Sequence, residues 1–405
     1  MALKVIGLPK AQVAPLQAES ATAQKLSNPP KHKYRKKNRT LADHTECLTV
    51  QHADTDVTRF MVGTQTLKIA SNQIHIVEVC DDTGILSAQT FSHPWGELWH
   101  LHWSPHDSRL FSACYNTITE DQGTSMKCAL YSLHKGEENE EENRLEPVTV
   151  LDIEAEVKVS YFHPSDSTKF LVVSDSKFGI WDIGNGEPVE TFKKPLQSKG
   201  GIKMSSGKWN PLESGAAVAT IQESTVKGWD LRTSKEVWSI EQPEAPLIRD
   251  IDYNRNRQHI LCTCGDDGRL KIWDTRAVDR GPVLALPGNH THWAWAVRYN
   301  LLHDELLLSC GSDSCCRLWW AGGAASESTV PQEPTAITSS PPQELPTRQQ
   351  NYADGPLHDF TTSDDSVYTV EWSAVDPWTF AFLSYDGRLI VHRIPKYIKY
   401  HILDI

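Results

Sequence analysis

The stretch that decides the fold is Gly-Asp-Asp-Gly-Arg-Leu-Lys-Ile-Trp-Asp at residues 265–274, a tight turn followed by a short run that ends in Trp-Asp. Trp181-Asp182 and Trp229-Asp230 end similar runs, and the three dipeptides lie 48 and 44 residues apart. An acidic residue stands six positions before each Trp, at Asp175, Glu223 and Asp267. A fixed period of this length is typical of a repeat protein whose unit is one small β-sheet.

The same six-residue spacing continues on both sides of this stretch. Downstream, Asp313 precedes Trp319, and Asp386 precedes His392, which stands where a Trp is expected. Upstream, Ser125 precedes Tyr131 and Ser71 precedes Val77. The chain therefore contains seven repeat positions, at residues 77, 131, 181, 229, 273, 319 and 392.

A second spacing supports the count of seven. An aromatic residue that closes an alternating run precedes five of these positions by 19 or 20 residues: Phe162, Trp209, Tyr253, Tyr299 and Trp372. Trp103 precedes Tyr131 by 28, which indicates about eight extra residues in that repeat. Four short strands per repeat, with Trp-Asp at the end of the third, predict an all-β fold, a seven-bladed WD-repeat β-propeller.

The composition divides the chain into an arm and a body. Residues 1–40 contain nine Lys or Arg and one Glu, and we predict a disordered basic N-terminal arm there, with the propeller over 41–405. Within the propeller, residues 136–146 form a predicted acidic loop, and residues 321–359 a disordered Pro/Ser-rich insert. Because an open ring exposes strand edges, we expect residues near 41–62 to complete the blade that contains 372–392. Deleting residues 1–40 is then expected to leave the thermal stability nearly unchanged.

Charge and hydropathy exclude several classes of function. The net charge is −12, and the arm contributes +8, so the body carries −20 and would repel nucleic acid. No apolar run is long enough to predict a transmembrane segment, and no secretory signal is recognisable, so we expect a cytoplasmic protein with reduced cysteines. The basic run 31–39 could contact acidic lipids or act as a nuclear signal, or could simply be part of a disordered arm.

Several conspicuous polar and aromatic residues are expected to be structural. We predict that His290, Asp313 and Trp319 share a buried hydrogen-bond network within one blade. Corresponding positions in other blades are held by Asp175, Trp181, Trp229, Asp267 and Trp273. We therefore predict no catalytic role for these residues.

The residue types of enzymes and metal proteins do not occur in the required spacings. No CxxC pair is present, and Cys262 and Cys264 would share one face of a strand, which suits packing better than a metal clamp. No Walker loop, HExxH motif or Gly-x-Ser-x-Gly elbow is found. We predict a protein that is not an enzyme and has no metal and no cofactor.

Seven phrases are more specific than the general repeat: Arg59–Gln65, Asn72–Ile76, Gly96–His100, His292–Asn300, Asp376–Trp378, Leu383–Leu389 and Lys399–Leu403. Through them the chain resembles, from about residue 59 to its end, the family of EARP and GARP complex-interacting proteins, WD-repeat proteins of endosomal and trans-Golgi traffic. The basic arm and the wording of the 321–359 insert depart from the family.

The resemblance implies a non-enzymatic adaptor that binds the EARP and GARP vesicle-tethering complexes. It further implies roles in endosomal recycling, endosome-to-Golgi transport and dense-core vesicle maturation, with recruitment from the cytoplasm to the trans-Golgi network and endosomes through these partners. One alternative stays open. Arg232 and Arg276 complete two WDxR motifs, a pattern of substrate receptors for cullin-RING ubiquitin ligases, although an Arg after Trp-Asp is also common in solvated turns.

Overall fold

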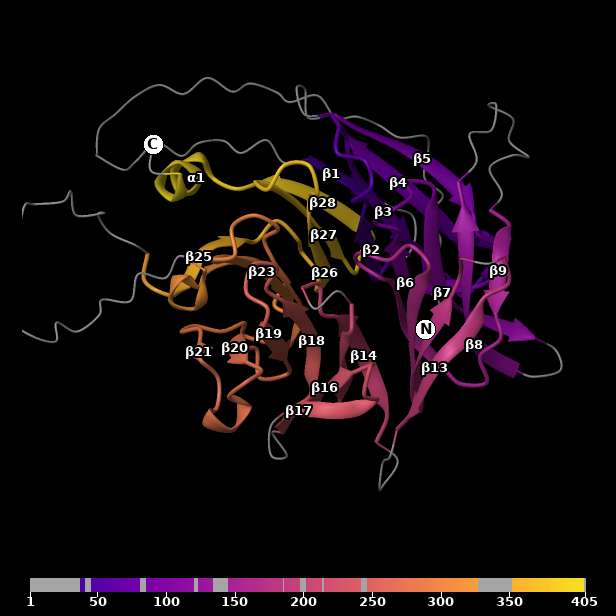
Figure 1. Cartoon of the computed structure of the whole chain (residues 1–405). Helices are drawn as coiled ribbons and strands as arrows, with labels where there is room; N and C mark the ends of the chain where they lie inside the picture. Colours follow the sequence, from indigo (N-terminus) through magenta and orange to yellow (C-terminus); the bar gives the residue numbers. More distant parts are fainter. Residues whose placement is uncertain are drawn as a thin grey trace, which may run out of the picture.

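The computed structural model is a ring of seven four-stranded antiparallel sheets, which Figure 1 shows arranged around a common centre. It describes residues 37–403, except 41–44, 81–84, 120–122, 134–144, 185, 197–201, 213–214, 242–245 and 327–351. The first strands of the sheets contact one another in a closed cycle, so each sheet is one blade of a propeller. The predicted all-β, seven-bladed fold is therefore confirmed.

The blades are numbered in chain order, and each is given from its inner to its outer strand. Blade 1 consists of β2 (Cys47–Val50), β3 (Thr58–Gly63), β4 (Gln73–Val79) and β5 (Leu86–Ser92), and blade 2 of β6 (Glu97–Trp103), β7 (Leu110–Thr119), β8 (Gly123–Ser132) and β9 (Pro147–Leu151). Blade 3 consists of β10 (Val157–Phe162), β11 (Lys169–Ser174), β12 (Lys177–Asp182) and β13 (Val189–Pro195), and blade 4 of β14 (Met204–Trp209), β15 (Ala217–Gln222), β16 (Thr225–Asp230) and β17 (Lys235–Glu241). Blade 5 consists of β18 (Ile248–Tyr253), β19 (Ile260–Gly265), β20 (Lys271–Asp274) and β21 (Leu284–Ala285), and blade 6 of β22 (Ala294–Tyr299), β23 (Leu306–Gly311), β24 (Cys316–Trp320) and β25 (Gly355–Phe360). Blade 7 consists of β26 (Val367–Trp372), β27 (Thr379–Ser384), β28 (Arg388–Arg393) and β1 (Lys37–Thr40). Short 3-10 turns η1 (Ile69–Ser71), η3 (Val278–Arg280) and η4 (Gly322–Ala324) and the helix α1 (Lys396–Ile402) complete the described part.

The repeat positions identified in the sequence fall at equivalent places in the blades. All seven lie in the third strand of their blade, and the aromatic residues of the second spacing close the first strands. The extra residues of blade 2 lengthen one hairpin, since β7 and β8 have 10 residues each. The spacing in the sequence thus reflects the path of the chain through each blade.

The ring is closed by a different segment from the one expected. Strand β1 pairs with β28 from Lys37↔Val391 to Thr40↔Arg388, so blade 7 obtains its outer strand from residues 37–40. The expectation that residues near 41–62 complete this blade is wrong, because β2 and β3 already belong to blade 1. The propeller therefore begins inside the range assigned to the arm, of which residues 1–36 lie outside the described part.

This closure changes the expected effect of truncation. Deleting residues 1–40 removes β1 and leaves the backbone groups of β28 unpaired on one edge, whereas deleting residues 1–36 preserves the pairing. At about 0.5–1.5 kcal/mol per hydrogen bond, the longer deletion should lower the free energy of unfolding by roughly 2 kcal/mol more than the shorter one. Differential scanning calorimetry of the two truncated proteins measures this difference, and equal melting temperatures would show that β1 adds no stability.

Two other segments also differ from the sequence-based boundaries. The predicted insert 321–359 contains η4 and the start of β25, so only its residues 327–351 lie outside the described part. Strand β25 pairs with β24 as the outer strand of blade 6. Of the predicted acidic loop, residues 136–144 are outside the described part, and Leu145 is buried against blade 2.

The core lies between the blades. All six residues are buried in each of the second strands β15, β19, β23 and β27. These strands have neighbours on both edges and are covered on both faces by adjacent blades, which explains why they are buried along their whole length. The outer strand β13 alternates between exposed and half-buried residues, as expected at the rim. The fold thus presents a rigid wall of first strands toward the centre of the ring.

Candidate functional site

A central cavity of about 620 Å³ is lined by the first strands of all seven blades. Because side chains alternate along a strand, every second residue faces the cavity, and the seven strands contribute side chains in layers. One layer is formed by the residue that directly precedes the last residue of each first strand. Its members are Thr49, His102, Tyr161, Lys208, Asp252, Arg298 and Glu371.

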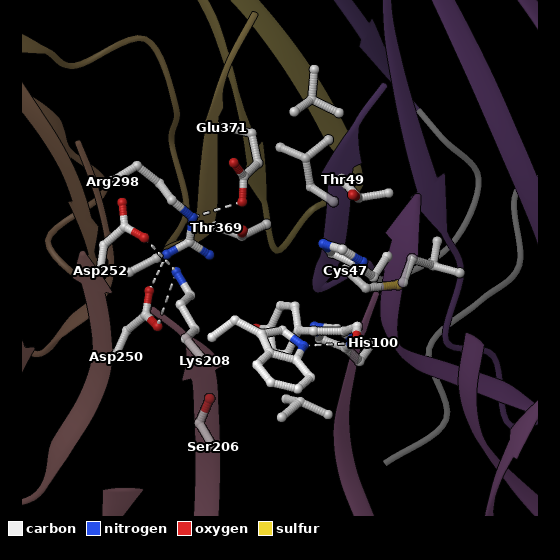
Figure 2. A pocket seen from close by; sticks show the side chains of 18 of the residues that line it. Cys47, Thr49, His100, Ser206, Lys208, Asp250, Asp252, Arg298, Thr369 and Glu371 are labelled. Atoms are coloured by element: carbon white, nitrogen blue, oxygen red, sulfur yellow. Dashed lines mark hydrogen bonds and ion pairs between the residues drawn. The ribbon is translucent and has the colours of Figure 1, made fainter. Parts of the chain in front are cut away.

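Four successive blades give this layer alternating charges, as Figure 2 shows. Lys208 of β14 lies 3.0 Å from Asp252 of β18, measured from Nζ to Oδ1. Arg298 of β22 lies 2.7 Å from Glu371 of β26, measured from Nε to Oε1. The first ion pair joins blade 4 to blade 5 and the second joins blade 6 to blade 7 along the inner wall.

Asp250, which lies in the adjacent layer of side chains, connects the two ion pairs. Its carboxylate accepts hydrogen bonds from the Arg298 guanidinium and from the backbone N–H of Val297, the latter at 3.2 Å. Asp252 likewise accepts one from the backbone N–H of Tyr299 at 2.8 Å. Side chains of blade 5 therefore hold the backbone of blade 6, which fixes the register between the two blades.

The pKa values of these groups follow from burial and from the neighbouring charges. Burial alone would raise the pKa of Asp252, but Lys208 and Arg298 outweigh it and lower the pKa below its ordinary value. Burial opposes the charge of Arg298, and Asp250 and Glu371 outweigh it and raise its pKa well above the usual range. The charged forms therefore stabilise one another, and the layer offers no carboxylate without a cation nearby.

The members of this layer from blades 1 to 3, Thr49, His102 and Tyr161, carry no charge at pH 7. Burial, with smaller effects from His100 and His52, lowers the pKa of His102 well below its ordinary value, so its imidazole is neutral at pH 7. The pKa of His52 falls to about 3 through burial and the charge of Arg255. Chemically, this layer combines paired charges in blades 4 to 7 with neutral polar side chains in blades 1 to 3.

The predicted network in blade 6 is present, with one additional member. His290 Nδ1 lies 2.9 Å from Asp313 Oδ1, and since a carboxylate only accepts, the imidazole donates there. Its Nε2 lies 2.7 Å from Ser309 Oγ, which also accepts a hydrogen bond from Trp319 Nε1 at 2.7 Å. Sequence reasoning missed Ser309, which joins His290 to Trp319.

The equivalent Trp residues of other blades have simpler surroundings. Trp273 donates to Thr263 at 3.0 Å and Trp229 to Thr220 at 2.9 Å, and both Thr residues occupy the strand position of Ser309. In blade 3, which contains Trp181, the position equivalent to Ser309 is held by Val172.

The predicted acidic residues of two other blades do not join such networks. Asp267 pairs with Lys271 at 2.7 Å, and Asp175 with Lys203 at 3.0 Å. The structure thus brings together the predicted residues of blade 6 but places Asp175 and Asp267 in local ion pairs.

The two Arg residues of the WDxR motifs lie on adjacent blades at the same end of the propeller. Their side chains are 77% and 63% exposed, in the turns after β16 and β20. Arg232 contacts both oxygens of Asp230, at 3.2 Å each, and Arg276 contacts both oxygens of Asp274, at 3.0 and 2.6 Å. Each Arg therefore also braces its own turn.

The cysteines lie mostly in the core. All nine are free thiols, and only Cys80 is exposed. Burial raises the pKa of Cys47 and that of Cys315 to about 12, which keeps these thiols protonated. Within the described ranges, no group of three or more His, Cys, Asp or Glu side chains is placed to hold a metal ion.

A family model and several known proteins are similar to most of this chain. The family model described as "EIPR1 beta-propeller" matches residues 37–319. The chain is similar to the EARP and GARP complex-interacting protein 1 of Rattus norvegicus, with 36% identity over 372 residues, 88% of this chain and 95% of the relative. The protein of the same name from Homo sapiens is 36% identical over 376 residues, with the same coverage. The WD repeat-containing protein DWA2 of Arabidopsis thaliana is 34% identical over 355 residues, 87% of this chain and 94% of the relative.

In the part of the chain that the structure describes, the helices are too short or too polar to cross a bilayer.

Proposed function

The chain belongs to the family of EARP and GARP complex-interacting proteins, and from this membership we propose that it is an adaptor that binds the EARP and GARP complexes. The observation that carries the proposal is the extent of the similarity, which covers 88% of this chain and 95% of the mammalian relatives. The similarity therefore extends over most of the propeller and is not confined to the short repeat motifs that unrelated WD proteins share.

The architecture supports an adaptor role. A closed ring with inter-blade ion pairs at its centre is rigid, and it presents two loop faces and a rim on which several partners can be held at once. The charges in the central cavity compensate one another, which favours a structural purpose for them over acid–base chemistry. The proposal is accordingly a non-enzymatic protein that acts through protein contacts.

The proposed role extends to membrane traffic. Through the two complexes, the protein would support endosomal recycling, endosome-to-Golgi transport and dense-core vesicle maturation. It would work from the cytoplasm and reach the trans-Golgi network and endosomes through its partners, without inserting into the bilayer itself. The family membership supports this extension.

Affinity purification of the full-length protein from cells, followed by mass spectrometry, tests the proposal. We expect core subunits of the EARP and GARP complexes to be recovered with the wild-type protein and to be depleted when a tagged unrelated propeller is used as the control. Recovery of ligase adaptor subunits in place of tethering subunits would contradict the proposal.

A second candidate function is a substrate receptor of a cullin-RING ubiquitin ligase. The specific observation in its favour is that Arg232 and Arg276 are exposed on adjacent blades of one face. If this function holds, the double variant Arg232→Ala plus Arg276→Ala should lose ligase adaptor subunits in the same purification. Under the adaptor proposal, this variant retains the tethering subunits.

A further inference from the structure

Six first strands have a β-bulge at the same level. In each of them, the second or third residue has no paired residue in the second strand of the blade. The skipped residues are Trp99, Lys158, Ser205, Arg249, Trp295 and Tyr368. A bulge re-aims the side chain of its extra residue. All but Lys158 line the central cavity, at the end where the first strands begin.

Large aromatic residues form a continuous cluster at this end. Trp293 packs edge-on against Trp295, with ring centroids 5.9 Å apart, and Trp295 lies 5.0 Å from Tyr368. The Arg249 guanidinium lies 5.3 and 4.6 Å from the Trp293 and Trp295 centroids. Asp266 holds it there through two hydrogen bonds of 2.6 and 3.0 Å. We name these four residues, Arg249, Trp293, Trp295 and Tyr368, together with Trp99, which lines the same cavity from blade 2, the aromatic mouth.

The aromatic mouth and its margin expose an unusual amount of apolar surface. Trp99 is 44% exposed and Trp293 41%, and next to them Leu247 is 40% and Ile202 37% exposed. Single exposed apolar residues are normal on a protein surface, but Ile202, Leu247 and Trp293 directly or nearly precede first strands and Trp99 is the third residue of β6, so all four lie at the end of the propeller where the first strands of blades 2, 4, 5 and 6 begin. An apolar patch with Trp and Arg at its centre has the composition of a binding hot spot.

The loops at the same end are acidic. Asp152, Glu154 and Glu223 are exposed, and no Lys or Arg of the described segments forms an ion pair with them. Asp152 and Glu154 lie just before β10, and the backbone oxygen of Glu223 accepts a hydrogen bond from the N–H of Ile248, the residue after Leu247. Negative charge therefore borders the apolar opening and favours a positively charged partner.

We propose that the aromatic mouth is the docking site for a Lys- or Arg-rich segment of a tethering-complex subunit that crosses the opening and places aromatic or aliphatic side chains on Trp99 of blade 2 and on Trp293 of blade 6. This assignment rests on the proposed function above. These side chains cover the two exposed indole surfaces, while the basic residues of the segment face the acidic loops. The opposite face of the propeller, where Arg232 and Arg276 lie in the turns after β16 and β20, remains free for a second partner.

The test uses full-length protein and purified EARP complex in a quantitative binding assay such as biolayer interferometry. The double variant Trp99→Ala plus Trp293→Ala should bind at least about tenfold more weakly than the wild type, because hot-spot aromatics dominate interface affinity. Leu302→Ala is the matched control: Leu302 is 66% exposed in the loop between β22 and β23, at the opposite end, and its loss should leave binding unchanged.

Two further variants separate a binding effect from a folding effect. Leu247→Lys adds a positive charge to an exposed position beside the mouth, so it should weaken binding several-fold without changing the melting temperature. Asp152→Lys plus Glu154→Lys should also weaken binding, and the weakening should be smaller in high salt, which screens exposed charges. If the wild type binds and all these variants bind equally well, the assignment of the mouth is overturned, whereas the proposed function stands. If the wild type itself does not bind the complex, the proposed function falls and the assignment falls with it.

Discussion

Substituting Met for Arg298 is expected to lower the free energy of unfolding by about 3–5 kcal/mol. The guanidinium is the cation that faces both Asp250 and Glu371 in the inner wall, and Met fills a similar volume without a charge. In the variant, the cation left near Asp250 is Lys208, whose Nζ lies 4.0 Å from the carboxylate. Glu371 loses its ion pair with Arg298, and no other described residue forms one with it. A buried carboxylate without a cation costs several kcal/mol because the Arg no longer compensates its desolvation.

The midpoint of chemical denaturation measures this effect, with Arg276→Met as the matched control. Arg276 also contacts an Asp through two hydrogen bonds, but its side chain is mostly exposed, so its loss should change stability little. Glu371→Gln combined with Arg298→Met should recover part of the lost stability, because it removes one of the two uncompensated charges. Equal effects of Arg298→Met and Arg276→Met would show that the inner ion pairs do not hold the blades together.

The sequence contains a signal for this charged layer that is independent of the repeat spacing. Lys208, Asp252, Arg298 and Glu371 each stand directly before the aromatic residue that closes a first strand. Their signs alternate from one repeat to the next, which predicts contacts only once the blades are known to lie side by side around a ring. The fold was predictable from the periods, whereas this site required the closed ring.

Ring closure and the mouth were less accessible to sequence reasoning. Strand β1 has the sequence Lys-Asn-Arg-Thr, which shows no apolar alternation and follows a basic run, so nothing in its composition indicates a strand. Its position follows from backbone pairing with β28. The bulges that re-aim Trp99, Arg249 and Trp295 are also backbone features, and the side-chain pattern alone does not identify which residue a ladder skips.

Replacing Trp319 by Ala is the second large perturbation, with an expected loss of about 3–5 kcal/mol. The indole is fully buried between blades 5 and 6, and it donates to Ser309, which also bonds His290. Alanine leaves a cavity of nearly the whole ring and removes one partner of a buried hydroxyl. Trp319→Phe retains most of the packing and removes the N–H, so its smaller loss, about 1–3 kcal/mol, combines the lost hydrogen bond with a small packing defect.

Trp181→Phe provides the comparison that separates packing from hydrogen bonding. Trp181 occupies the same position in blade 3, but Val172 stands where Ser309 stands in blade 6, so its indole N–H has no hydroxyl opposite it. We expect Trp181→Phe to shift the denaturation midpoint less than Trp319→Phe does. When Trp319→Phe is introduced into a His290→Ala background, its additional shift should be close to that of Trp181→Phe, because the hydrogen-bond network is already broken there. If the two Phe variants lose the same stability, the Trp residue acts only through its volume, and the hydrogen bonds of blade 6 add nothing to the strength of the ring.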